Sequence, residues 1–367
     1  MDKDLLYQVA LTLIPNIGPV QAKILLQHCN AEEIFHAKKS FLEKIEGIGP
    51  VRAASIAAFK DFTQAEDEIK FIEKYKIEPL FLTNYNYPKR LLNCYDSPTL
   101  LFYKGEADLN ASKIVAIVGS RSHTDYGKQA TEKIIKELVS QNILVVSGMA
   151  YGIDAIAHKA ALKNQLSTVG VLAHGLDQIY PAEHAGLARD MLKHNGGLLT
   201  EFRSNSKPDK HNFPTRNRIV AGMSDATIVI ETGIKGGSMI TAELANSYNK
   251  EVFALPGKIT DSKSTGCNYL IKNNKAMLLT DAEELVQVMN WGESKKKPSA
   301  ASQKQLFIEL TADEKIVVTI LQQKEKIHID EINSKSGLSS SAVAAGILNL
   351  ELQNVILSLP GKLYQLA

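Results

Sequence analysis

Between residues 111 and 290, short apolar runs alternate with stretches that have helical character. The seven runs are Ile114–Val118, Ile143–Val146, Thr168–Leu172, Leu198–Thr200, Ala226–Ile230, Val252–Leu255 and Ala276–Leu279. Strands that alternate with helices are typical of βαβ units and of a mainly parallel sheet. In such a sheet, ligands bind outside the carboxyl ends of the strands. We therefore expect function in the loops that follow these runs.

Shifts in composition divide the chain into five segments, in an α/β fold whose main domain is Rossmann-like. Residues 1–78 are predicted to form a helical-hairpin (SAM-like) domain, and residues 79–110, rich in aromatics and prolines, an extended connector with short strands that packs on the next domain. The Rossmann-like domain is assigned to residues 111–292, and a polar flexible linker to residues 293–310. Three helical patterns and a hairpin predict a winged-helix domain over residues 311–367.

The helical segment contains one short repeat, in which Ile17–Ala22 (IGPVQA) returns as Ile48–Ala53 (IGPVRA). In each copy the glycine suits a turn and the proline suits the first position of a helix. Helical hairpins of this kind can offer backbone N–H groups to DNA phosphates, but similar hairpins also serve packing alone. The sequence leaves both interpretations open.

Charge and cysteine content exclude some classes of protein. The formal net charge is only +2, so any basic surface must come from local clustering. The three cysteines are an odd number, lie far apart and form no C-x-x-C pair, which argues against a disulfide framework or a zinc site. No apolar run is long enough to span a membrane. We expect a soluble, cytoplasmic protein without a metal or cofactor.

Two glycine-containing loops at the expected sheet edge suit a bound phosphate. The first predicted strand ends in Gly119-Ser120-Arg121, and the fifth leads to the turn Gly236-Gly237-Ser238. Glycine allows close approach of the backbone, a following helix N-terminus attracts anions, and the Arg121 guanidinium is suited to phosphate. The alternative for Arg121 is an ion pair with a neighbouring carboxylate.

The strongest local signal is the segment 203–218, in which five Arg or Lys residues stand against one Asp, with an aromatic ring among them. Its candidate DNA-binding residues are Lys207, Lys210, Phe213, Arg216 and Arg218. Basic side chains that hold a phosphate backbone, together with an aromatic ring that stacks on an unpaired base, indicate a site for single-stranded nucleic acid. In the alternative interpretation Phe213 lies in the core and Arg216 or Arg218 binds carboxylates.

Catalytic motifs are scarce. Asp154 and His158 lie four positions apart on one predicted helix and could serve acid–base chemistry, but we interpret them as a helix cap and a buried, satisfied histidine. The chain contains no Walker A, H-E-x-x-H or G-x-S-x-G sequence.

Taken together, these loops resemble the DprA/Smf family, the DNA-processing proteins of bacterial transformation. The resemblance covers residues 87–280 and rests on GSR at 119–121, SGMAYGIDAIAH at 147–158, HNFPTRNRIVAGMS at 211–224, GGSMITAE at 236–243 and LPG at 255–257. It implies a protein without catalytic turnover that binds and protects single-stranded DNA, homodimerises through its Rossmann-like domain and loads the RecA recombinase. By motif, it places Arg121, Lys210 and Phe213 in the DNA pocket, with Lys207, Arg216, Arg218 and the Gly236–Ser238 turn as secondary candidates.

Two other functions stay open. Rossmann-like enzymes that cleave the N-glycosidic bond of nucleoside monophosphates carry a P-G-G-x-G-T-x-x-E loop, whose frame persists in Gly236, Gly237 and Glu243, although Met239 and Ile240 replace its glycine and threonine. The other alternative is a transcriptional regulator that reads duplex DNA with its winged helix. The predicted third helix of that domain, however, lacks any basic residue over 340–349.

Overall fold

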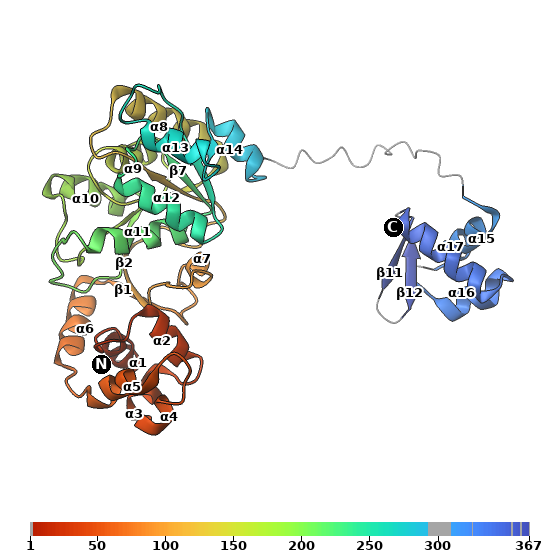
Figure 1. Ribbon diagram of the computed structural model, residues 1–367, viewed down its shortest axis with the longest axis horizontal. Coiled ribbons are helices and arrows are strands. Elements are labelled where there is room, and N and C mark those ends of the chain that lie inside the picture. The colour runs from red at the N-terminus through yellow and green to blue at the C-terminus, as the bar shows by residue number, and fades with distance from the viewer. Residues whose placement is uncertain (1–2, 293–309, 325, 354, 360–361, 367) are drawn as a thin grey trace. The chain divides into compact units, whose positions relative to one another are not determined.

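The computed structural model describes residues 3–292, 310–324, 326–353, 355–359 and 362–366. The chain divides into two compact units, Met1–Glu293 and Ser294–Ala367 (Figure 1). Apart from Leu310, the predicted linker lies outside the described residues.

A nine-stranded sheet organises the first unit, with the strand order β1-β2-β6-β5-β4-β3-β7-β8-β9. The strands are β1 (Glu78–Phe81), β2 (Leu100–Gly105), β3 (Ile114–Val118), β4 (Leu144–Ser147), β5 (Thr168–Val171), β6 (Gly197–Thr200), β7 (Ala226–Val229), β8 (Glu251–Ala254) and β9 (Met277–Leu278). The strands from β3 to β9 pair in parallel, which confirms the predicted Rossmann-like class.

The two strands of the predicted connector belong to this same sheet. Strand β2 pairs antiparallel with β6, and β1 pairs antiparallel with β2. Strand β2 is buried over Leu100–Tyr103 and so covers the edge that β6 would otherwise expose. Because a long, turn-rich segment separates the two strands, the sequence pattern does not indicate that they pair.

Both faces of the central strands β3, β4, β5, β6 and β7 are buried, which explains their uninterrupted apolar runs. In β3, Val115 and Ile117 pack into one core, whereas Ala116 and Val118 pack into the other. The helices that follow or connect the strands are α7 (Lys89–Leu92), α8 (Asp125–Glu137), η1 (Leu138–Gln141), α9 (Ile153–Lys163), η2 (Ala182–His184), α10 (Ala185–Lys193), α11 (Asn212–Gly222), α12 (Gly237–Ser247), α13 (Thr265–Lys272) and α14 (Ala282–Val288).

The N-terminal helices share a core with the β1–β2 end of the sheet, where Figure 1 shows them gathered. They are α1 (Lys3–Leu11), α2 (Pro19–Leu26), α3 (Ala31–His36), α4 (Lys39–Leu42), α5 (Gly49–Ala58) and α6 (Thr63–Tyr75). Phe81, Leu100 and Phe102 of the sheet lie in this core. The ammonium of Lys23 in α2 also donates a hydrogen bond of 2.9 Å to the carbonyl of Cys94. The helical domain is therefore fixed to the sheet rather than tethered.

The C-terminal unit has the predicted winged-helix elements and one additional short strand. It consists of α15 (Ala312–Leu321), β10 (Ile327–His328), α16 (Ile329–Ser336), α17 (Ser340–Leu352), β11 (Ile356–Leu359) and β12 (Leu363–Leu366). The three strands form a sheet in the order β10-β12-β11. The predicted turn at Pro360 and Gly361 lies outside the described residues.

The pairing of β2 with β6 can be tested at Gly197. A Cβ atom there would meet the buried Tyr103 ring at 2.4 Å, so Gly197→Ala forces the two strands apart. We expect the free energy of unfolding to fall by about 1–3 kcal/mol, measured by urea denaturation. Gly186→Ala in α10 is the matched control, since a Cβ atom there meets nothing within 4 Å. Equal stability of the two variants would contradict this packing.

Candidate nucleic-acid interface

The strand order reverses at β3, which has β4 on one side and β7 on the other. Loops that leave the carboxyl ends of strands at such a point diverge and leave a crevice between them. Here the loops after β3, β4 and β7 border a cleft of about 310 Å³. Its lining includes these sequence-predicted residues: Gly119, Ser120, Arg121, Phe213, Arg216, Gly236, Gly237 and Ser238. The structure thus brings eight of the eleven predicted site residues together.

Arg121 and Phe213 face each other at this cleft. The Cζ atom of Arg121 lies 5.0 Å from the centroid of the Phe213 ring, and the centroid of the Tyr180 ring lies 6.2 Å from that of Phe213. Phe213 is half-buried at the second position of α11 and belongs to none of the core clusters of the described residues. Arg121 is exposed and, within the described part of the chain, forms no ion pair with a carboxylate. Its guanidinium is therefore available to an anion.

Glycine residues around the cleft allow the backbone to approach neighbouring groups closely. A Cβ atom on Gly119 would lie 2.6 Å from the Ile153 side chain, so the loop after β3 can pack against α9 only with glycine there. Helix α12 begins at Gly237, with Gly236 as its N-cap, and both residues line the cleft. The partial positive charge of this helix end favours a phosphate.

A buried carboxylate that the sequence reasoning missed fixes the loop that carries Arg121. Glu231, fully buried after β7, accepts a hydrogen bond of 2.9 Å from the Thr124 backbone N–H and a further one from the Thr124 hydroxyl. Thr124 is also the N-cap of α8, where its hydroxyl accepts from the Gly127 N–H. The loop that carries Arg121 is thereby tied to the neighbouring strand.

Arg216 lies beneath the cleft and is only 4% exposed. Its guanidinium donates to the carbonyl oxygens of Gly148 and Val171, which follow β4 and end β5. Burial lowers the pKa of Arg216 to about 10, and the nearby Arg121 cation acts in the same direction. Burial also raises the pKa of the Asp154 carboxyl, although the positive charge of Arg216 opposes this rise. Arg216 therefore remains a cation at neutral pH. Its side chain lines the cleft and also links α11 to β4 and β5.

Arg218 has a different environment. It is 9% exposed, donates to the Glu201 carboxylate and the Asp96 carbonyl, and is not among the residues that line the cleft. This placement matches the alternative interpretation, in which an arginine of this segment binds a carboxylate. Its contribution is to anchor α11.

Lys207 and Lys210 lie on the loop that precedes α11, outside the lining of the cleft. Both side chains are exposed, and neither forms an ion pair among the described residues. Their ammonium groups are therefore available to an anion outside the cleft, on the loop that leads to Phe213.

Asp154 and His158 are both buried, as expected, but two details of the expectation are wrong: the N-cap of α9 is Gly152 rather than Asp154, and the Nε2 atom of His158 has no hydrogen-bond partner among the described residues. The Asp154 carboxylate accepts a 3.3 Å hydrogen bond from the N–H of Ala150, which lies in the loop before α9. His158 is fully buried, and its Nδ1 lies 2.7 Å from the Thr168 hydroxyl. Burial lowers the pKa of His158 to about 3, so the ring is neutral at physiological pH and has no access to a substrate in the cleft.

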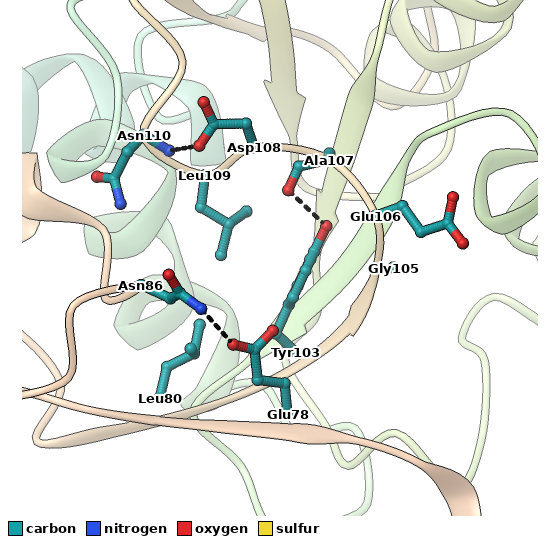
Figure 2. Close-up of a pocket in the computed structure, with 10 residues that line it drawn as sticks. All are labelled: Glu78, Leu80, Asn86, Tyr103, Gly105, Glu106, Ala107, Asp108, Leu109 and Asn110. Carbon is teal, nitrogen blue, oxygen red and sulfur yellow. Dashed lines mark hydrogen bonds between the residues drawn. The ribbon is translucent and has the colours of Figure 1, made fainter.

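A second cavity, of about 260 Å³, lies beside the loop after β2. Because β2 runs antiparallel to β6, this loop is at the amino ends of the parallel strands, away from the cleft. In Figure 2 the Tyr103 hydroxyl donates to the Ala107 carbonyl, while the Glu106 side chain points away from the ring. Glu78 and Asp108 also line this cavity. Among the described residues, however, no three acidic, His or Cys side chains lie together as possible metal ligands.

Every described helix falls short of the length and apolarity needed to cross a membrane.

Comparison with known proteins identifies the family. The model of the DNA recombination-mediator protein A family matches residues 78–290, and that of the DprA winged-helix domain matches residues 297–362. The chain belongs to the DprA/Smf family of DNA-processing proteins. Protein Smf of Synechocystis is 32% identical over 98% of both chains, and the DNA processing protein DprA of Streptococcus pneumoniae is 42% identical over 54% of this chain and 70% of that one.

Two solved structures of the family are also similar. DNA processing protein A of Streptococcus pneumoniae matches with a TM-score of 0.65 and 32% identity, over 78% of this chain and 98% of that chain. The protein from Helicobacter pylori, whose structure was described for its single-stranded DNA binding mode, matches with a TM-score of 0.53 and 31% identity, over 59% and 96% of the two chains. The resemblance stated from the sequence is confirmed.

The environment of Arg218 predicts that its substitution lowers stability rather than removing a contact with DNA. Arg218→Met leaves the Glu201 carboxylate, whose side chain is 13% exposed, without its cation, at a cost of about 3–5 kcal/mol in the free energy of unfolding. Arg121→Met, at an exposed position, should leave urea denaturation unchanged. An Arg218→Met protein that is as stable as the wild type but binds DNA more weakly would show that Arg218 contacts the ligand instead.

Proposed function

We propose that this protein binds single-stranded DNA in the cleft between β3 and β7 and loads RecA onto the bound strand. The observation that supports the proposal best is the pairing of the Arg121 guanidinium with the half-buried Phe213 ring at a cleft walled by glycine turns. A cation for phosphate beside a ring for a base is the combination that single strands require.

In the proposed mode of binding, phosphates contact Arg121, the Gly119–Ser120 backbone and the N-terminus of α12. Phe213 stacks on one base, a contact worth about 1–3 kcal/mol. Lys207 and Lys210 bind phosphates along the strand as it leaves the cleft. A duplex keeps its bases paired and stacked, so it cannot use Phe213 in this way. Binding should therefore depend on salt and discriminate weakly between sequences.

The proposed activity needs no catalytic turnover. The glutamate that an N-glycosidase loop would require corresponds to Glu243, which is exposed on α12, pairs with Lys275 at 3.5 Å and does not line the cleft. Met239, in place of the glycine of that loop, is buried. These placements favour binding over hydrolysis.

The winged-helix unit is not proposed as a reader of duplex DNA. The outer side of α17 presents Ala344, Ala345, Leu348 and Leu352, all exposed, and the helix has no Arg or Lys. A helix in the major groove needs cations for phosphates and polar groups for base edges. We assign this unit an accessory role.

Homodimerisation through the Rossmann-like domain and the contact with RecA extend the proposal, and family membership supports both. The edge strand β9 is compatible with a subunit contact, since Met277 is 36% and Leu278 46% exposed at the end of the sheet. Two clefts on one strand would bind by avidity and present the strand to the recombinase.

The proposal predicts the behaviour of two cleft variants. Arg121→Ala and Phe213→Ala should each weaken binding of a labelled single-stranded oligonucleotide at least about tenfold in fluorescence anisotropy, with unchanged thermal stability. The wild-type log affinity should fall with log salt by about 0.7 per phosphate contact, and Arg121→Ala should lower that slope. Arg189→Ala, at an exposed arginine on α10, is the matched control. Wild-type affinity in both cleft variants would refute the proposed site.

A further inference from the structure

The N-terminal helical domain contributes a buried carboxylate to the loop that carries the lysines. Glu68 lies on α6 and is only 4% exposed. Its two oxygens accept hydrogen bonds of 3.0 Å each from the backbone N–H of Ser204, and one oxygen accepts a further bond of 2.5 Å from the Ser204 hydroxyl. Glu68 and Ser204 are 136 positions apart, so this contact connects two domains.

The same short stretch of loop is held from its other side by the sheet domain. The Asp177 carboxylate accepts from the Asn205 N–H at 3.1 Å. The Ser206 carbonyl accepts hydrogen bonds of 3.1 Å from both the Gly175 N–H and the Gln178 side chain. Residues 204–206 are thus clamped between α6 and the loop after β5, whereas the lysine that comes next is exposed.

The clamped residues 204–206 can set the position of the loop that carries Lys207 and Lys210. Lys207 follows the clamped residues directly, and Lys210 and Phe213 lie four and seven positions beyond Ser206. The Lys207 carbonyl accepts a 3.3 Å bond from the Asn212 side chain at the start of α11. The loop between clamp and helix is short, so a shift at Ser204 moves the lysines relative to the cleft.

Burial makes Glu68 a costly residue unless its hydrogen bonds are formed. A carboxylate taken out of water needs several strong donors, and here the backbone and side chain of Ser204 supply three hydrogen bonds to it. An apolar residue would pack in this position without that cost. The carboxylate is therefore better explained by its hydrogen bonds to Ser204 than by a contribution to the stability of the helical domain.

We propose that Glu68 is a positioning residue for single-stranded DNA binding, through which the helical domain holds Lys207 and Lys210 beside the cleft. The inference rests on the proposed function of the cleft. It gives the helical domain a role in the site without any contact between that domain and DNA.

A double-mutant cycle in the full-length chain tests this role. Glu68→Ala should weaken binding of single-stranded DNA about fivefold to tenfold and lower the salt slope by about 0.7 for each phosphate that the lysines no longer bind. In a Lys207→Ala/Lys210→Ala background, Glu68→Ala should have no further effect on affinity. Ser204→Ala, which removes one of the three hydrogen bonds, should give a smaller change in the same direction. Asp67→Ala is the matched control, because that neighbouring carboxylate is exposed and pairs with Lys70.

The outcomes separate this inference from the proposal on which it rests. Equal weakening by Glu68→Ala in both backgrounds, or none in either, would overturn the positioning role. If Lys207→Ala/Lys210→Ala binds like the wild type while Arg121→Ala does not, the cleft stands and the inference fails. If Arg121→Ala and Phe213→Ala also bind like the wild type, the proposed function itself fails.

Discussion

The guanidinium of Arg216 ties helix α11 to the carboxyl ends of β4 and β5, and the candidate site depends on this tie. The guanidinium donates hydrogen bonds to the carbonyl oxygens of Gly148, which follows β4, and Val171, which ends β5. Backbone groups at the ends of strands have no partner within the sheet and need one elsewhere. The same residue forms a wall of the cleft and fixes the start of α11, on which Phe213 lies. Because the cation is buried beside Asp154, its removal would leave both carbonyls and a carboxylate without this cation.

Two kinds of charge therefore meet at this edge of the sheet. Arg216 and Arg218 are buried and hold elements together, whereas Arg121, Lys207 and Lys210 are exposed and form no ion pair among the described residues. The buried set ties α11 to neighbouring elements, and in the proposed function the exposed set attracts phosphate. If a single strand binds as proposed, walls that are already held by hydrogen bonds lower the entropy lost on binding.

This division also shows how far the sequence could lead. The strands of the parallel sheet were predictable because burial on both faces leaves continuous apolar runs, and Arg121 was predictable because it follows such a run. Composition alone could not separate the buried Arg218 from the exposed Lys210, since both lie in one basic segment. Glu68 and Glu231 had no local signal, because their partners lie 136 and 107 positions away along the chain. Short strands were expected in the segment that forms β1 and β2, but their pairing with the main sheet was hidden by the turn-rich segment between them.

The central claim is that a single strand lies across the carboxyl ends of β3 and β7. Photocrosslinking tests it most directly, with a single-stranded oligonucleotide that carries 5-bromodeoxyuridine and with mass spectrometry of the linked peptides. The account predicts crosslinks in residues 119–124, 207–213 and 233–240. Crosslinks confined to the helical residues 3–58 or to the winged-helix residues 310–366 would contradict it.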